Sequence, residues 1–112
     1  METINRYRPL ILAYLEEYVR YRPGHGDITP TLVVDEAHDQ YLLLHAGWAE
    51  IGRVHSIILH VHLLDGKIWI EHDGTPPPGI ANYLVEAGVP PEAIVLAFYH
   101  PNKRSETAFA VA

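Results

Sequence analysis

HVHLLDGKIWIE, the stretch from His60 to Glu71, decides the fold of this 112-residue chain. Asp65-Gly66 stands at its centre, between two runs rich in β-branched, aromatic and aliphatic residues. Aspartate followed by glycine supplies the two positive φ angles that a two-residue type I′ turn requires. The stretch is therefore predicted to be a β-hairpin whose register is set by its turn.

Counting outward from the turn assigns each side chain of the hairpin to one of two faces. The count places His60 opposite Glu71, because side chains alternate between the faces along each strand. One face is apolar and holds Leu59, Val61, Leu63, Ile68 and Ile70. The other face is mixed and holds His60, His62, Trp69 and Glu71.

Two further strands precede the hairpin and complete a predicted four-stranded antiparallel meander. Residues 28–35 form an edge strand, because Pro30 cannot donate a hydrogen bond within a sheet interior. Residues 41–48 form the second strand, and a turn at 49–52 leads into the third, 53–64. We expect the core face to combine Leu42, Leu44, Ile57 and Leu59. The opposite face then collects the candidate interface residues, which are Tyr41, Leu43, His45, Ile58, His60, His62, Trp69 and Glu71.

Segments with helical periodicity precede and follow the predicted strands in the sequence. Residues 4–21 are predicted to form an amphipathic helix with a bent start near Pro9. Its stripe comprises Ile4, Tyr7, Ile11, Tyr14, Leu15, Tyr18 and Val19. A loop at 22–27 follows. It is not a phosphate-binding loop, because such a loop requires a strand before it and none is predicted there. A second helix spans 79–87 and stops at Gly88, residues 94–99 form a short strand-like segment, and 107–111 form a closing strand. The predicted fold class is α+β.

The composition predicts one acidic domain over residues 1–112. Hydrophobic residues make up 48% of the chain, enough for one core, and 14 acidic against 8 basic residues give a formal net charge of −6. This charge repels phosphate backbones, so we expect no direct nucleic-acid binding. The chain has no cysteine, which excludes disulfides and thiolate chemistry. With neither a signal pattern nor an apolar run of the ~20 residues that a membrane helix needs, a soluble cytoplasmic protein is expected.

The histidines of the mixed face allow two interpretations. His60 and His62 lie about 7 Å apart on one strand, and His45 with Glu71 on neighbouring strands would complete a set of nitrogen and oxygen ligands for a metal. In the structural interpretation His60 pairs with Glu71, and His62 stacks on Trp69. We favour the structural interpretation, and expect neither a metal nor another cofactor. No serine, histidine and aspartate set for nucleophilic catalysis is supported either.

Several motifs in order along the chain carry a family resemblance. They are LLHAGW at 43–48, DGKIWI at 65–70 leading into HDGT at 72–75, LVEAGVP at 84–90, IVL at 94–96 with Phe98, and the ending FAVA at 109–112. Together they resemble the XisI family, small cyanobacterial proteins typified by the controlling factor for excision of the fdxN element. Two local departures are the prolines that stand where an acidic residue often follows HDGT, and Ala97, which replaces a common glycine.

The resemblance implies a role in programmed excision of a DNA element beside a site-specific recombinase. The usual partner is a protein called XisH, which resembles nuclease-fold proteins, and a homodimer is also allowed. No catalytic residues are established for the family, so none is carried over. The leading hypothesis is a non-enzymatic controlling factor that acts through a XisH-like partner. The alternatives are an antitoxin-like inhibitor of a nuclease-fold partner and a metal-dependent hydrolase built on His45, His60 and His62.

The mixed face also lacks a cover in the predicted fold. The two helices suffice for one face of a single sheet, and the other face carries Trp69 among aromatic and apolar residues with few charges. Such a surface is typical of an interface core. We expect it to be covered by self-association, by the nuclease-like partner or by residues 94–111 folding back.

Overall fold

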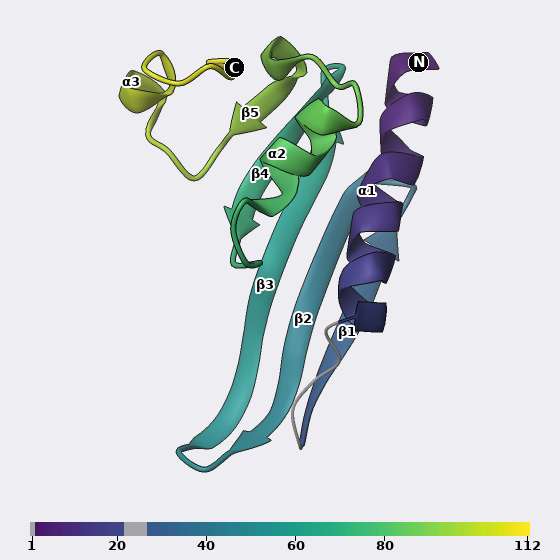
Figure 1. The fold of residues 1–112 in the computed structure, drawn as a ribbon, viewed down its shortest axis with the longest axis vertical. Coiled ribbons are helices and arrows are strands. Elements are labelled where there is room, and N and C mark those ends of the chain that lie inside the picture. The colour runs from purple at the N-terminus through teal and green to yellow at the C-terminus, as the bar shows by residue number, and fades with distance from the viewer. Residues whose placement is uncertain (1, 22–26) are drawn as a thin grey trace.

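The computed structural model describes residues 2–21 and 27–112, and begins with a long helix that leads into an antiparallel sheet (Figure 1). The helix is α1 (Glu2–Tyr21). The strands that follow are β1 (Asp27–Asp35), β2 (Gln40–Ala49), β3 (Gly52–Leu64) and β4 (Lys67–Asp73). They confirm the predicted helix and meander, whereas all of the predicted loop at 22–27 except Asp27, which begins β1, lies outside the described residues.

The remainder of the chain adds a second helix and a fifth strand. Its elements are α2 (Gly79–Glu86), the short 3₁₀ helix η1 (Pro91–Ala93), β5 (Ile94–Leu96) and α3 (Pro101–Arg104). The sheet order is β1-β2-β3-β4-β5, and β5 runs parallel to β4 while the other neighbours are antiparallel. The fold class is α+β, as predicted, and β1 with Pro30 lies at an edge. The predicted closing strand is reduced to one bridge between Val95 and Ala110.

The turn between β3 and β4 has the predicted backbone. Asp65 has a φ of 53° and Gly66 a φ of 75°, the pair of positive angles that defines a type I′ turn. The pairs nearest the turn match the predicted register. Further out, Glu71 is an extra residue in β4, so His60 pairs with His72 and not with Glu71.

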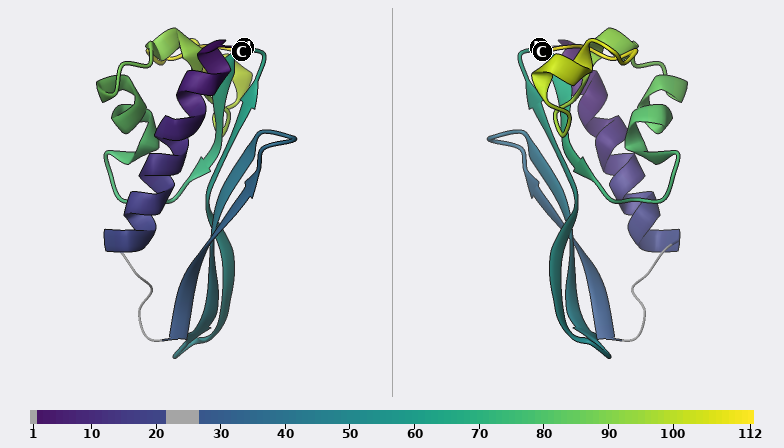
Figure 2. Two further views of the ribbon diagram at one scale, coloured as in Figure 1. Left: turned by 90° about the vertical axis from the view of Figure 1, so that its right-hand side faces the viewer. Right: turned by 90° about the vertical axis from the view of Figure 1, so that its left-hand side faces the viewer.

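Both α1 and α2 lie on one side of the sheet, which we call the helix face (Figure 2). The predicted stripe of α1 faces this sheet: Tyr7, Ile11 and Leu15 are buried, and Tyr14, Tyr18 and Val19 pack against the core from partly buried positions. Ile4, also predicted there, lies outside the residues whose side chains are described. Burial of this stripe, at about 25 cal/mol per Å² of apolar surface, provides most of the free energy that holds α1 on the sheet.

A polar contact also positions α1. Arg8 donates from Nε to the Tyr41 hydroxyl at 2.8 Å, and its Nη2 forms an ion pair with Asp39 in the turn between β1 and β2. Tyr41 is fully buried, and burial raises the pKa of its phenol. Arg8 therefore satisfies a buried hydroxyl and fixes α1 to one end of the sheet.

The prediction of which β2 side chains face the core is wrong. Tyr41 and Leu43, expected on the mixed face, are 0% exposed in the core. An unbroken hairpin from the turn after Ala49 would pair Leu42 with Leu59, but Leu43 pairs with Leu59 instead. The cause is an extra residue in β3, Ile58, which shifts the register by one and exchanges the two faces of β2.

The bulge at Ile58 also explains why four other residues lie on the opposite face of the sheet from the one predicted. Leu42, Leu44 and Ile57, expected in the core, lie on the side of the sheet away from the helices, whereas Ile58 packs against the core. The backbone carbonyl of Ile58 accepts a hydrogen bond from Gly74 N at 2.6 Å. The extra residue thus connects β3 to the end of β4.

The helix α2 ends just before Gly88, as predicted. Gly88 has a φ of 104°, its N–H bonds the carbonyl of Val85, and the N–H of Val89 bonds the carbonyl of Leu84. These two bonds form a Schellman motif, and Val89 adds a buried apolar contact. No helix in the described part of the chain is long and apolar enough to span a bilayer.

Candidate functional site

The side of the sheet away from α1 and α2 carries the candidate site, and we call it the open face. It comprises Thr31 and Val33 of β1, Gln40, Leu42 and Leu44 of β2, Ile57, His60 and His62 of β3, and Trp69 and Glu71 of β4. Of the eight candidate residues, the structure brings together His60, His62, Trp69 and Glu71 there. The other four, Tyr41, Leu43, His45 and Ile58, lie on the helix face.

A chain of polar contacts crosses the open face. His62 donates from Nε2 to Glu71 Oε2 at 2.6 Å and stacks on Trp69 with 6.1 Å between ring centroids. His60 lies 5.9 Å from His62 and donates from Nε2 to Gln40 Oε1 at 2.7 Å. Burial lowers the pKa of His60, and the neighbouring His62 lowers it further. The stacking of His62 was predicted, whereas Glu71 pairs with His62 and not with His60.

Apolar side chains adjoin this polar chain. Val33 and Ile57 are 41% and 46% exposed, and they pair with the half-buried Leu42 and Leu44 across the strands. An apolar strip beside imidazoles and a tryptophan has the composition of a protein interface core. This strip was absent from the predicted site because the bulge at Ile58 was not foreseen.

The C-terminal segment covers one end of the open face. Arg104 places its guanidinium 5.7 Å from the ring centroid of Trp69. It also donates to the carbonyls of Ala97, Tyr99 and Val111, at 3.0 to 3.3 Å. Trp69 remains partly exposed. The return of residues 94–111, one of the three covers expected from the sequence, therefore occurs at this end of the face and leaves the strip beyond it uncovered by this segment. Sequence reasoning missed Arg104, because the residues around it carry no motif or periodicity.

The histidines do not converge as the hydrolase alternative requires. His45 lies on the helix face, where its ring is 6.4 Å from that of Tyr18, and so is separated from His60 and His62 by the sheet. Within residues 2–21 and 27–112, no hydrogen-bond partner lies beside its buried Nε2. Among the described residues, no group of three or more histidine, aspartate or glutamate side chains is placed to hold a metal.

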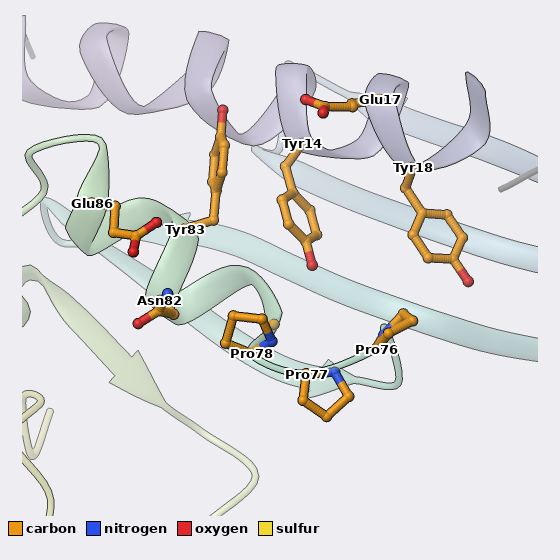
Figure 3. A pocket seen from close by; sticks show the side chains of 10 residues that line it. Tyr14, Glu17, Tyr18, Pro76, Pro77, Pro78, Asn82, Tyr83 and Glu86 are labelled. Atoms are coloured by element: carbon orange, nitrogen blue, oxygen red, sulfur yellow. The ribbon is translucent and has the colours of Figure 1, made fainter. Parts of the chain in front are cut away.

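A second surface feature lies between α1 and the segment leading into α2 (Figure 3). It is a groove of about 450 Å³, which we call the tyrosine–proline groove. Its walls carry Tyr14, Tyr18 and Tyr83, the three prolines of residues 76–78, and the carboxylates of Glu17 and Glu86. Tyr14 and Tyr18 point from α1 toward the prolines (Figure 3), and the rings of Tyr14 and Tyr83 are 5.0 Å apart.

The HDGT stretch fixes the groove in place. Asp73 accepts from Thr75 N at 2.8 Å through Oδ1 and from Ile80 N at 2.9 Å through Oδ2, so it serves the first turn of α2. The hydroxyl of Thr75 donates to Asp73, which leaves Tyr14 to donate its own hydroxyl to Thr75 at 2.8 Å. One aspartate thereby joins β4, α2 and, through Thr75, α1.

Comparison with known proteins assigns the family. The model of the XisI protein family matches residues 1–111, almost the entire chain. This chain belongs to the XisI family. No curated protein matches its sequence.

Two crystal structures of XisI proteins from Anabaena variabilis share the fold. A XisI-like protein is 32% identical, with a TM-score of 0.88 over 96% of this chain and 97% of the other. The fdxN element excision controlling factor XisI is 39% identical, with a TM-score of 0.86 over 98% of this chain and 99% of the other. The XisI fold therefore extends over this chain almost from end to end.

The fold accommodates both departures of this chain from the XisI pattern. The prolines after HDGT line the tyrosine–proline groove, and the carboxylate of Asp73 already serves the start of α2. Ala97 follows β5, where its N–H bonds the Ile70 carbonyl at 2.9 Å and its own carbonyl accepts from Arg104. Neither departure disturbs an element of the XisI fold.

Proposed function

We propose that this chain is a regulatory, non-catalytic factor that controls the excision of a DNA element. The observation that carries the proposal is its match, over 98% of its length, to a protein described as the fdxN element excision controlling factor. The histidines of the open face engage neighbouring side chains in structural contacts, which is consistent with a regulatory role.

We further propose that the factor acts through a protein partner of the XisH type. The formal net charge of −6 opposes close approach to a phosphate backbone, so control by direct DNA binding is disfavoured. The uncovered strip of the open face offers apolar and aromatic groups of the kind that anchor protein partners. The partner would be seated there, beside Trp69.

Deletion of the gene from its own host tests the proposed function. Long-read genome sequencing detects every rejoined junction without presupposing which element is served. We expect at least one junction to disappear and to return when the wild-type gene is restored. An unchanged set of junctions would refute control of excision.

Co-purification from the host tests the proposed surface. Ile57→Glu adds a charge to the open face at a side chain that is 46% exposed, and should abolish recovery of the partner. Ile51→Glu makes the same change at a turn residue that is 98% exposed, and should leave recovery intact. Equal recovery by both variants would move the partner to another surface. If the purified partner is a nuclease that this chain inhibits, the antitoxin-like function replaces the proposed one.

A further inference from the structure

The tyrosine–proline groove has the surface chemistry of a peptide site. Its volume of about 450 Å³ falls within the ~300–1,000 Å³ typical of ligand pockets. Tyr14, Tyr18 and Tyr83 are only partly buried, so their rings remain available to a ligand. Grooves lined with aromatic rings accept extended segments, because the rings offer flat apolar area and a polar edge.

The charge of the groove indicates which class of ligand it favours. Glu17 of α1 and Glu86 of α2 are both exposed and line it from two helices. Within the described residues no lysine or arginine lines it, and Arg20, one turn beyond Glu17, is not part of the lining. The pKa of Tyr83 is raised by burial and by the negative charge of Glu17, so the field of this carboxylate reaches the ring. A cation is therefore favoured both over the tyrosine rings and beside the carboxylates.

Arginine fits this combination better than lysine. Its guanidinium is planar, stacks on aromatic faces and donates in a fork to carboxylates, whereas the lysine ammonium is a compact and strongly hydrated charge. We propose that the tyrosine–proline groove binds an arginine-containing extended segment of a protein, with the guanidinium against the tyrosines between Glu17 and Glu86. The groove lies on the helix side of the sheet, so this inference does not depend on the partner proposed for the open face.

Fluorescence anisotropy with a synthetic peptide tests the proposal. The probe is a labelled hexapeptide of alternating proline and arginine, and its control replaces each arginine by citrulline, which keeps the shape and removes the charge. We expect saturable binding of the arginine peptide and at least tenfold weaker binding of the citrulline peptide. A lysine version should bind more weakly than the arginine version.

Matched charge variants separate the groove from general attraction to an acidic protein. The double variant Glu17→Gln/Glu86→Gln should lose at least tenfold in affinity. The double variant Glu16→Gln/Glu92→Gln removes the same charge at two exposed side chains outside the groove, and should lose less than twofold. All four sites are exposed, and equal melting temperatures verify that both proteins fold. Absence of saturable binding, equal affinity for the citrulline peptide, or equal losses in the two double variants would each overturn the proposal.

Discussion

Gly66 is held at a φ of 75°, and a Cβ atom placed there would meet no atom within 4 Å apart from its two chain neighbours. The first cost of substitution is therefore one of backbone conformation. Gly66→Val should destabilise the protein by about 1 kcal/mol or more, because a β-branched residue is strained at positive φ. Thermal melting measures the loss. Gly66→Asn is the control and should melt close to the wild type, since asparagine tolerates this region; an unchanged melt of the valine variant would contradict the prediction.

His60 makes stability depend on pH. Burial and the neighbouring His62 lower its pKa, while Glu71 acts in the opposite direction. Its neutral form is thus favoured by folding, so its contribution is fully present above the unfolded pKa of about 6.5 and is lost as pH falls from there through the lower pKa of the folded state. We expect the urea midpoint of the wild type to fall between about pH 7.5 and pH 5.5, and to fall less in His60→Gln. His55→Gln, at an exposed site, should retain the full decrease; identical pH profiles for His60→Gln and the wild type would rule out His60 as the source.

At the level of single residues, the sequence predicts only what depends on near neighbours. The turn at Gly66 and the stacking of His62 on Trp69 follow from a short count along one hairpin. The faces of β2 depend on Ile58, and the pairing of His60 depends on Glu71. Neither bulge has a local signal such as glycine, and the bond from Gly74 to the Ile58 carbonyl joins residues that only the folded sheet brings together. Because of the one extra residue, Ile58, four of the eight predicted site residues lie on the helix face.

Among the elements, α2 is joined to the end of β4 by the side chain of Asp73. Asp73→Ala removes the acceptor for Ile80 N and both bonds to Thr75, so it should destabilise the protein by about 1–2 kcal/mol. Urea denaturation measures the change. Glu92→Ala, at an exposed site, should change stability by less than about 0.5 kcal/mol, and an equal loss in both variants would remove the capping role from Asp73.

The elements themselves are largely predictable because their signals lie within them. The stripe of α1 and the glycine stop after α2 each use residues a few positions apart, and both elements form as expected. The C-terminal segment differs, because Arg104 orders it by bonding carbonyls of the segment and by lying over Trp69. Contacts of this kind have no periodicity, so the sequence carried no signal that predicts them.

For the whole molecule, Trp69 is the residue through which an interface on the open face is best measured. Trp69→Ala should weaken association with the partner by about 2 kcal/mol, or roughly 30-fold in Kd, and should cost less than that in stability. Trp48→Ala removes the same side chain at the far end of β2, where it is 60% exposed, and should leave the affinity unchanged. Calorimetric titration against the purified partner provides both values. Normal binding by Trp69→Ala would exclude an interface centred on this tryptophan.

The bond between Tyr14 and Thr75 has a consequence for synthesis. It joins residues 61 positions apart, and translation at about 5–20 residues per second needs roughly 3–12 s to make the chain between them. During that interval α1 has left the ribosome ahead of the strands that will bury its stripe, and a lone helix of this length is marginal in water. The first helix to be made can therefore meet Asp39 and Tyr41 early through Arg8, but it acquires its contact with Thr75 only after all of β4 has been made.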